Sequence, residues 1–364
     1  MKRGSSMTPR MRVLCAMKRE GKPDRVPFEI SWGAFTPRLM RIYHEKTGSP
    51  LAPDDYFDFD TRYVRPDPGN KIIARGKYFP GGIPDSDVSF DEWGIGTVPT
   101  EYEIPDYKYH PLATCRTVSE IEGYEWPDLD AGYRYTIMEQ RTKEIQEKGY
   151  AVCGDLYQTI FETAWLMRGM EDFLSDLYLN PAVAHAICEC ITSIRVKQAA
   201  RMAHAGIDIL RLGDDVVTQQ GLMMSHDAYR SFFKNRIKRI IAAARRENPD
   251  ILVFMHSCGR VEDMIEEFMD EGVDVINPVQ PECNDLSMIV QRYGGKISFW
   301  GGIGVQSVMP HGTPEDVLRA MRETMVILGS GGGWLAAPAH ILDPAIPWEN
   351  IVAFVDSARS LYYK

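Results

Sequence analysis

Regular alternation is the feature that most constrains how this chain folds. From about Tyr150 onward, short runs rich in apolar and β-branched residues alternate with longer amphipathic stretches. This alternation is typical of βαβ units, which build a parallel sheet covered by helices. We expect strands at Ala151–Gly154, Ile207–Gly213, Ile251–His256, Val273–Asn277, Ile297–Gly301 and Trp334–Ala337, and helices at Pro181–Ala205, His226–Glu247, Val261–Glu271, Asp285–Tyr293, Pro314–Leu328 and Pro347–Tyr362.

The number of strands favours a closed barrel. Val26–Ser31 and a weaker run at Tyr56–Tyr63 bring the predicted strands to eight, the number in an α/β fold of the (β/α)₈ TIM barrel type. A chain of 364 residues suits one barrel with enlarged loops, so a single domain over residues 1–364 is predicted. Residues 65–127 are rich in Pro, Gly, Asp and aromatics, which predicts a loop and hairpin insertion near the barrel mouth. A doubly wound open sheet is the alternative, because one sequence does not reveal strand order.

Charge, apolar runs and cysteines restrict the partners of the chain. A formal net charge of -10 without a dense Lys/Arg cluster argues against a nucleic-acid partner. No apolar run is long enough to span a bilayer, so no membrane partner is expected. The seven cysteines are an odd number without framework spacing, which predicts reduced thiols and a cytoplasmic location.

A histidine and a cysteine follow one predicted strand directly. His256 and Cys258 are two residues apart in extended chain, so their side chains point the same way and can bind one zinc ion. The alternative is a hydrogen-bonded histidine beside an inert thiol. Two residues are candidates for a third ligand: His340, just after the last predicted strand, and Cys283, after the strand at Val273–Asn277. His340 is preferred, because the last strand lies across the barrel mouth from the strand of His256.

Carboxylates stand at other predicted strand ends. Asp214 and Asp215 follow the strand at Ile207–Gly213 and could supply a general acid or base. Neighbouring side chains point in opposite directions, so only one of the two is expected to face the site, and the other is expected to cap a helix. Glu162 is a further catalytic candidate, whereas Asp58 and Asp60 are weaker ones whose alternative role is a loop salt bridge.

Two glycine-rich runs, at residues 301–304 and 329–333, suggest a phosphate-binding loop. Neither has the lysine or the strand-to-helix spacing of a nucleotide fingerprint. Close approach of the backbone to a large ligand is the preferred interpretation, and it makes Gly302 and Gly332 candidate cofactor-binding residues.

Several short motifs lie at the predicted strand ends and in the loops after them. They are Asp208 with Gly213-Asp214-Asp215, His256-Ser257-Cys258-Gly259, Gly272-Val273-Asp274 with Asn277-Pro278, Trp300-Gly301-Gly302-Ile303, His311-Gly312-Thr313-Pro314-Glu315-Asp316, and Gly331-Gly332-Gly333 with Ala337-Pro338-Ala339-His340. In these motifs the chain resembles the uroporphyrinogen decarboxylase superfamily over nearly its whole length. This superfamily joins the decarboxylase of haem synthesis to zinc-dependent methylcobamide methyltransferases.

Departures from the decarboxylase pattern favour the methyltransferase-like branch. The decarboxylases place an arginine-rich segment after the first strand to grip substrate carboxylates, whereas this chain has Glu29 and Ser31 there. Coenzyme M methyltransferases bind zinc through His-x-Cys and a later Cys. His256 and Cys258 match the first part, and His340 stands at the later position, near which the decarboxylases also carry a functional histidine. One thiolate and two imidazoles leave the zinc site positive, which suits an ether or amine leaving group.

The resemblance therefore implies a zinc-dependent methyltransferase or demethylase. It would move a methyl group between a small methylated substrate and a corrinoid (cobalamin) supplied by a partner protein. Two alternatives stay open: a metal-independent decarboxylase of another acid, and a non-catalytic binder of a corrinoid or tetrapyrrole. The methyl donor, the methyl acceptor and the formation of a homodimer are also left open.

Overall fold

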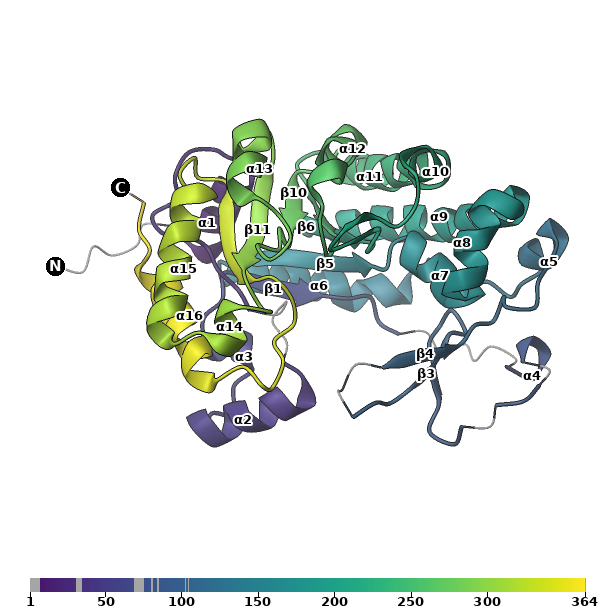
Figure 1. Ribbon diagram of the computed structural model, residues 1–364, viewed down its shortest axis with the longest axis horizontal. Coiled ribbons are helices and arrows are strands. Elements are labelled where there is room, and N and C mark those ends of the chain that lie inside the picture. Colours follow the sequence, from purple (N-terminus) through teal and green to yellow (C-terminus); the bar gives the residue numbers. More distant parts are fainter. Residues whose placement is uncertain are drawn as a thin grey trace.

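The computed structural model describes residues 7–30, 35–68, 75–79, 81–83, 85–101, 103 and 105–363. Its centre is a seven-stranded parallel sheet surrounded by helices (Figure 1). The strands follow one another in the order β1 (Thr61–Val64), β5 (Ala151–Tyr157), β6 (Ile209–Gly213), β9 (Leu252–His256), β10 (Val275–Asn277), β11 (Ser298–Ile303) and β12 (Trp334–Pro338). The six strands predicted after Tyr150 are confirmed, with small shifts at their ends.

A short segment near the N-terminus closes this sheet. Phe28 forms a parallel bridge with Ala336 of β12, and its carbonyl accepts a hydrogen bond from the N–H of Asp60, just before β1, at 3.1 Å. The predicted strand Val26–Ser31 is thus reduced to one bridge, and Ser31 lies outside the described residues. Because the two edge strands are joined through this segment, the sheet is not an open doubly wound one, and the TIM-barrel-like fold is confirmed.

The weaker strand predicted at Tyr56–Tyr63 is wrong in its first half. Pro53 begins a short helix, α3 (Pro53–Tyr56), and strand β1 begins only at Thr61. Proline fits the first turn of a helix because its missing N–H would have no helical partner there. The aromatic residues of this stretch favoured a strand in the prediction, but the preceding proline begins a helix.

Helices cover the outside of the sheet. The predicted helices correspond to α9 (Pro181–His204), α10 (His226–Tyr229) with a π-helical turn at Arg230–Lys234 and α11 (Asn235–Glu247), α12 (Ile265–Glu271), α13 (Leu286–Tyr293), α15 (Pro314–Ile327) and α16 (Trp348–Ser360). Helices that were not predicted include α1 (Pro9–Met17), α2 (Pro37–Thr47), α6 (Tyr133–Glu147), α7 (Phe161–Arg168), α8 (Met170–Leu179) and α14 (Val308–His311). Helices α7 and α8 follow β5 and therefore help to position the barrel mouth.

Helix α1 fills the amino-terminal end of the barrel. Its residues Val13, Ala16 and Met17 are buried in one cluster with inward-facing residues of the strands, including Phe254 and Trp300. The side chain of Thr8 caps the first turn of this helix by accepting the N–H of Met11 at 3.2 Å. This end of the barrel is therefore closed by apolar packing and is not open to a ligand.

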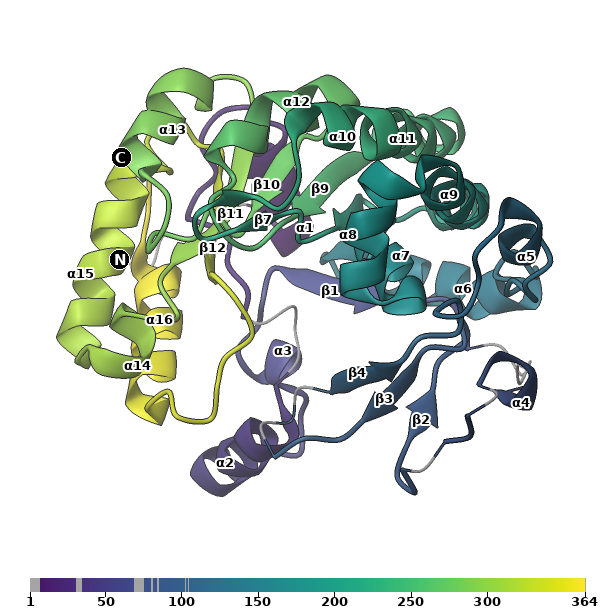
Figure 2. The same cartoon turned by 45° about the vertical axis from the view of Figure 1, so that its right-hand side comes forward.

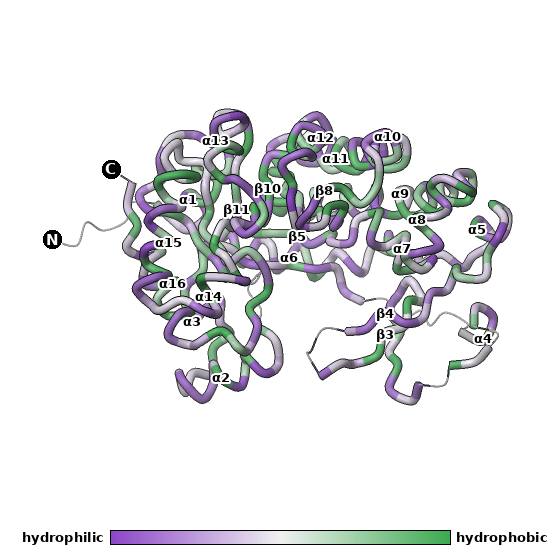
Figure 3. The backbone as a smooth tube through the Cα atoms, in the orientation of Figure 1, coloured by the Kyte–Doolittle hydropathy of each residue, from purple (hydrophilic) through white to green (hydrophobic). Residues whose placement is uncertain are grey.

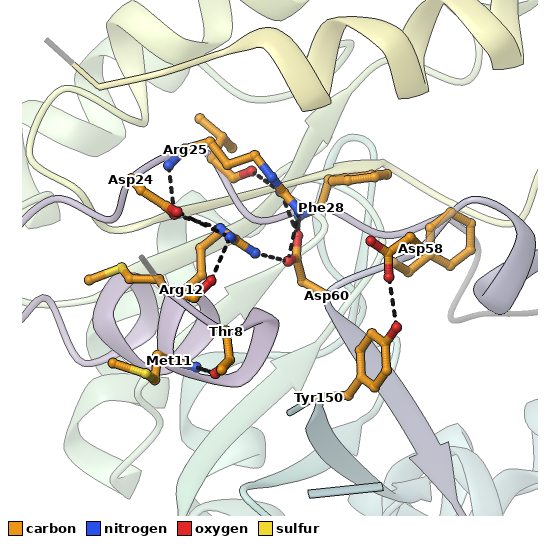
Figure 4. Close-up of polar contacts among 12 residues, drawn as sticks. Thr8, Met11, Arg12, Asp24, Arg25, Phe28, Asp58, Asp60 and Tyr150 are labelled. Atoms are coloured by element: carbon orange, nitrogen blue, oxygen red, sulfur yellow. Dashed lines mark hydrogen bonds and ion pairs between the residues drawn. The ribbon is translucent and has the colours of Figure 1, made fainter. Parts of the chain in front are cut away.

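Three aspartates at the same end join the strands to one another. Each stands directly before a strand and accepts a backbone N–H from its neighbour in the barrel: Asp60 from Phe28 at 2.9 Å, Asp208 from Val152 at 2.9 Å and Asp274 from Val253 at 2.7 Å. Each also pairs with arginine: Asp60 with Arg12 and Arg25 (Figure 4), Asp208 with Arg10, and Asp274 with Arg245. Asp60, a weaker candidate for chemistry, thus has a structural role far from the mouth. Asp58 likewise accepts the hydroxyl of Tyr150 at 2.7 Å.

The insertion predicted at residues 65–127 forms a three-stranded antiparallel sheet, where one hairpin was expected. Its strands are β2 (Ser89–Phe90), β3 (Gly96–Val98) and β4 (Asp106–Tyr109), with the short helices α4 (Arg75–Tyr78) and α5 (Val118–Glu122) beside it. Figure 2 shows this sheet below the barrel strands, next to α2. A second small hairpin, β7 (Val217–Thr218) and β8 (Gly221–Leu222), follows β6.

Hydropathy follows this arrangement. In Figure 3 the hydrophobic residues run along central strands such as β5, whereas hydrophilic residues colour much of the outer helices α13 and α15. No helix of the described ranges combines the length and the apolar character needed to cross a bilayer. The seven cysteines, all within the described residues, are free thiols. That the whole chain forms one domain stays a prediction.

Candidate active site

The candidate site is a cavity of about 690 Å³ at the carboxyl end of the barrel strands. Barrel enzymes bind their substrates at this end, because the loops that follow the strands converge there. The cavity brings together four of the predicted residues, Glu162, Asp215, Cys258 and His340, with His256 buried beside Cys258. Its other polar lining includes Glu103 and Tyr107 of the insertion, Tyr157, Gln280 and Asp343.

His256 is held in one orientation by the side-chain amide of Asn277. The side-chain N–H of Asn277 donates to the carbonyl of Trp300 at 2.9 Å, so the Asn277 oxygen faces Nδ1 of His256, with which it forms a short hydrogen bond. Nδ1 must therefore carry the proton, and Nε2 is left with its lone pair. This is the tautomer in which a histidine binds a metal through Nε2 while a neighbouring group fixes the ring.

Cys258 and Asp215 face Nε2 of His256. Sγ of Cys258 lies 3.2 Å from Nε2 of His256, and Oδ1 of Asp215 lies 3.6 Å from the same atom. The backbone N–H of Cys258 donates to Oδ1 of Asp215 at 2.7 Å, which fixes the carboxylate beside the thiol. The three ligand atoms lie within 4.8 Å of one another.

This donor set fits a zinc ion. Ligand atoms at about 2.0–2.3 Å from a tetrahedral zinc ion lie about 3.3–3.7 Å from one another. The observed separations of 3.2 Å and 3.6 Å match those edges closely. An imidazole, a thiol and a carboxylate are also the three ligand types that zinc prefers. The residues present therefore fit a catalytic zinc site with its fourth position toward the cavity.

The adjacent aspartates Asp214 and Asp215 have separate environments, as their opposite directions predicted. Asp214 is buried and accepts the backbone N–H groups of Ile160 and Glu162, each at 2.9 Å, at the start of helix α7. Burial raises the pKa of Asp214 to about 6, although these hydrogen bonds and the charge of Arg195 oppose the shift. Asp214 therefore anchors α7 and does not line the cavity, while Asp215 does.

Glu162 is a buried carboxyl at the cavity wall. Its side chain is 6% exposed, and Oε2 accepts the backbone N–H of Asp215 at 3.3 Å. Burial raises its pKa well above the ordinary value, and the charges of Asp215 and Asp214 add to the shift. No lysine or arginine pairs with it within the described part of the chain. A buried carboxyl with a raised pKa in a cleft is a candidate for proton transfer or ligand binding.

His340 and Cys283, the two candidates for a third ligand, lie in different places. The ring of His340 has its centre 6.5 Å from that of His256, and His340 lines the cavity. It is not part of the group of three ligand atoms. The third member of that group is Asp215, where His340 was expected. Cys283 donates to the carbonyl of Gln280 at 3.8 Å and does not line the cavity.

Gly302 and Gly332 are not brought to the cavity. A Cβ on Gly302 would lie 2.9 Å from Leu328 and 3.1 Å from Thr324, so this glycine lets β11 pack closely against α15. Gly332 precedes β12 at the other end of the barrel, where a Cβ would meet the carbonyl of Gly21 at 2.3 Å. Their close backbone contacts are with the protein itself.

Two functional residues were missed in the sequence. Asn277 orients His256, and the ring of Tyr157 lies edge-on to His256 with centres 5.5 Å apart. Each is the last residue of its strand, β10 and β5. That position was the available signal, because side chains at the carboxyl ends of barrel strands face the mouth.

Two residues just beyond these strands have a left-handed backbone. Gln158, which lines the cavity, has φ 55°, and the buried Val279 has φ 50°. A β-branched residue rarely adopts this conformation, so Val279 is held there by its surroundings. Such strain is concentrated at functional sites, which agrees with the placement of the cavity.

Comparison with known proteins identifies the family. A family model described as uroporphyrinogen decarboxylase (URO-D) matches residues 87–361. The chain belongs to this family. Uroporphyrinogen decarboxylases are among its relatives; that of Pseudomonas syringae pv. tomato is 22% identical over 281 residues, which cover 74% of this chain and 75% of the relative.

A methyltransferase matches over more of the chain. The methylated-thiol–coenzyme M methyltransferase of Methanosarcina mazei is 25% identical over 367 residues, covering 98% of this chain and 90% of the relative. A solved methyltransferase from Methanosarcina mazei superposes with a TM-score of 0.71 at 17% identity, covering 97% of this chain and 99% of that one, and shows the same fold. The predicted resemblance to the methyltransferase-like enzymes of this family is confirmed.

Proposed function

We propose that this chain is a zinc-dependent methyltransferase. It would move a methyl group between a small methylated substrate and a corrinoid carried by a partner protein. One observation carries the proposal: the ligand atoms of Asp215, His256 and Cys258 converge beside a cavity large enough for a small substrate. The similarity to a methyltransferase over nearly the whole chain supports it.

In the proposed site, zinc is held by His256, Cys258 and Asp215. The ion would supply Lewis acidity that lowers the pKa of a thiol, alcohol or amine bound at its fourth position. One thiolate and one carboxylate balance its two charges, whereas the pair of imidazoles expected from the sequence leaves the site positive. A neutral site favours keeping a thiolate nucleophilic, so a thiol or its methyl thioether is the preferred substrate.

The surrounding residues have distinct roles in this proposal. Asn277 fixes the tautomer of His256 and so holds its nitrogen toward the ion. Glu162, buried at the cavity wall next to Asp215, would contact the part of the substrate beyond the sulfur. His340, which also lines the cavity, would orient the substrate or donate a hydrogen bond to the departing group.

Metal analysis and methyl transfer test the proposal together. Protein purified from zinc-supplemented medium should contain about one zinc ion per chain. It should transfer methyl groups from methylcobalamin to small thiols, followed by the change in cobalamin absorbance. Cys258→Ala should lose the metal and the activity, whereas Cys283→Ala, a cysteine next to the site that does not line it, should keep both. Metal-free wild-type protein, or activity that survives Cys258→Ala, would contradict the proposal.

Uroporphyrinogen is not expected to be a substrate. Glu29 is buried inside the barrel, where it accepts hydrogen bonds from Trp300 and Tyr63 at 3.0 Å each, and no lysine or arginine is among the cavity-lining residues of the described chain. The several carboxylates of uroporphyrinogen would thus face the carboxylates of the cavity, which would repel them. Decarboxylation of uroporphyrinogen by the pure protein at about one per second or faster would overturn this expectation.

A further inference from the structure

The cavity carries an excess of negative groups. Four of its described lining residues are carboxylates, Glu103, Glu162, Asp215 and Asp343, and none is a lysine or an arginine. His340 is the one basic side chain among them. If Asp215 is committed to the metal, three carboxylates remain to act on the rest of a bound substrate. A cleft lined by one sign of charge attracts ligands of the opposite sign and repels those of the same sign.

The carboxylates differ in how far protein groups already satisfy them. Glu103 accepts the backbone N–H of Arg38 at 2.9 Å, and its other oxygen lies 4.0 Å from the exposed Arg41. Asp343 accepts only a backbone N–H, that of Ala345 at 2.7 Å, among its described side-chain contacts. Glu162 likewise has only hydrogen-bond partners and no cationic one in the described chain. Glu162 and Asp343 are therefore the carboxylates available to a substrate cation.

The position of Glu162 and the aromatic rings of the cavity also favour an organic cation as the ligand. Glu162 adjoins the three-ligand cluster directly, because its Oε2 accepts the N–H of Asp215 at 3.3 Å. Tyr157 and Tyr107 line the same cavity, and electron-rich rings attract organic cations. A short substrate whose sulfur reaches the cluster would place a group two carbons away beside Glu162.

We propose that the substrate is a small thiol, or its methyl thioether, that carries an ammonium group, and that the cavity excludes thiols that carry a sulfonate or carboxylate in its place. This inference rests on the proposed function, since it assigns the substrate class of the same site. The sulfur lies at the cluster of Asp215, His256 and Cys258, and the ammonium group lies against Glu162 and Asp343.

The transfer balances without a further reactant. The thiol loses its S–H proton to solvent. A sulfur lone pair forms the new S–CH₃ bond, and the Co–CH₃ bond of the methylcorrinoid breaks with its electron pair left on cobalt, which passes from Co(III) to Co(I). The reverse reaction takes the methyl group from the thioether to Co(I), and the thiolate takes up a proton.

Three thiols of equal length test the inference: cysteamine, mercaptoethanol and mercaptoethanesulfonate (coenzyme M). They differ only in bearing a positive, a neutral or a negative end group. Isothermal titration of the zinc-loaded protein should give cysteamine an affinity about tenfold or more above that of mercaptoethanol, and mercaptoethanesulfonate should bind weakest. Methyl transfer from methylcobalamin should follow the same order in kcat/KM. Equal affinities, or preference for the sulfonate, would overturn the inference.

Charge-neutral variants locate the ammonium site. Glu162→Gln and Asp343→Asn should each reduce the ratio of cysteamine to mercaptoethanol affinity by about threefold or more. Glu315→Gln, which removes the same charge on an exposed residue away from the cavity, should leave the ratio unchanged. The ratio separates charge recognition from loss of fold, because misfolding lowers both affinities. An unchanged ratio in both cavity variants would contradict the inference.

The two proposals fail in different ways. Methyl transfer to none of the three thiols, in zinc-loaded protein, would reject the proposed function and the inference with it. Transfer to mercaptoethanesulfonate in preference to cysteamine would leave the methyltransferase proposal standing and reject the cationic substrate alone.

Discussion

The two ends of the barrel use carboxylates in opposite ways. At the amino end, Asp60, Asp208 and Asp274 each accept a backbone N–H from a neighbouring segment of the barrel and each pair with arginine. At the mouth, Glu162 and Asp215 have no arginine or lysine partner within the described chain. The carboxylates at the amino end already have both hydrogen-bond and cationic partners in the protein. Those at the mouth have no cationic partner in the described chain and can still bind a cation.

This difference indicates which carboxylates stabilise the fold. A buried carboxylate with good hydrogen bonds and an opposite charge supports the barrel, and removal of the carboxylate leaves the arginine buried and unpaired. A buried carboxyl without a cation is unfavourable for folding, so one that also lines a cavity is a candidate for ligand binding. The following predictions test this contrast, beginning with the largest effect.

Asp60→Asn should cause the largest loss of stability. Asp60 is fully buried between Arg12 and Arg25, so the variant leaves Arg25 without its anion and leaves Arg12 with Asp24 alone. We expect a loss of about 3–5 kcal/mol in the free energy of unfolding, measured by urea titration. Asp58→Asn is the matched control, because Asp58 is exposed and accepts a hydrogen bond from the uncharged hydroxyl of Tyr150. A loss of similar size in both variants would remove the contrast between saturated and free carboxylates.

Asp215→Ala should affect metal affinity and leave the metal-free fold intact. Loss of a ligand should weaken zinc binding about 100-fold, which is about 2.7 kcal/mol, as measured by competition with a chelator. His340→Ala should weaken it by about tenfold or less, since His340 lies outside the ligand cluster. The opposite order would restore the third ligand that the sequence predicted.

Glu271 shows that a raised pKa does not by itself mark the mouth. It lies in α12, where burial raises its pKa to about 8 and Tyr229 donates a hydrogen bond to it at 2.6 Å. Because the folded pKa exceeds the unfolded value, its contribution to stability is present at low pH and is lost as pH rises toward 8. Glu271→Gln should therefore gain about 1 kcal/mol or more relative to wild type between about pH 5 and pH 8. Thermal unfolding at the two pH values checks this, and a pH-independent difference would contradict it.

Cys283→Ala should have the smallest effect. Its thiol contacts the carbonyl of Gln280 and the amide of Asn284 in a loop beside the site, and it does not line the cavity. Zinc content should stay unchanged, and the unfolding free energy should change by less than about 1 kcal/mol. A loss of zinc in this variant would indicate that the loop after β10 contributes to the metal site.

The barrel could be predicted from the sequence because its strands are apolar runs with a regular spacing. The ends of these strands could be predicted in the same way, and they placed His256, Cys258 and His340 at the mouth. Helix α1 was missed, since its buried face is short and includes Arg12, whose charge is compensated only by distant aspartates. Contacts between residues far apart in sequence leave no local pattern.

The ligand set was less predictable for a similar reason. Two aspartates after one strand point in opposite directions, but the sequence does not say which way either one turns. In the structure Asp214 accepts backbone N–H groups at the start of α7. Asp215 points the other way and belongs to the cluster with His256 and Cys258. Close approach of the backbone looks the same in sequence whether the neighbour is a ligand or the protein, and the close neighbours of Gly302 and Gly332 in the structure are protein atoms.

The closure of the barrel at Phe28 and Ala336 has a consequence for the order of synthesis. Phe28 is synthesised long before Ala336, because the two residues of this junction are far apart in the sequence. Domains fold as their segments emerge, but contacts of such wide sequence separation form late. We therefore expect the nascent chain to hold an open, partly formed sheet until β12 has been translated. A stalled chain that ends before β12 would expose the unpaired side of β11, which makes it a target for chaperones or proteases.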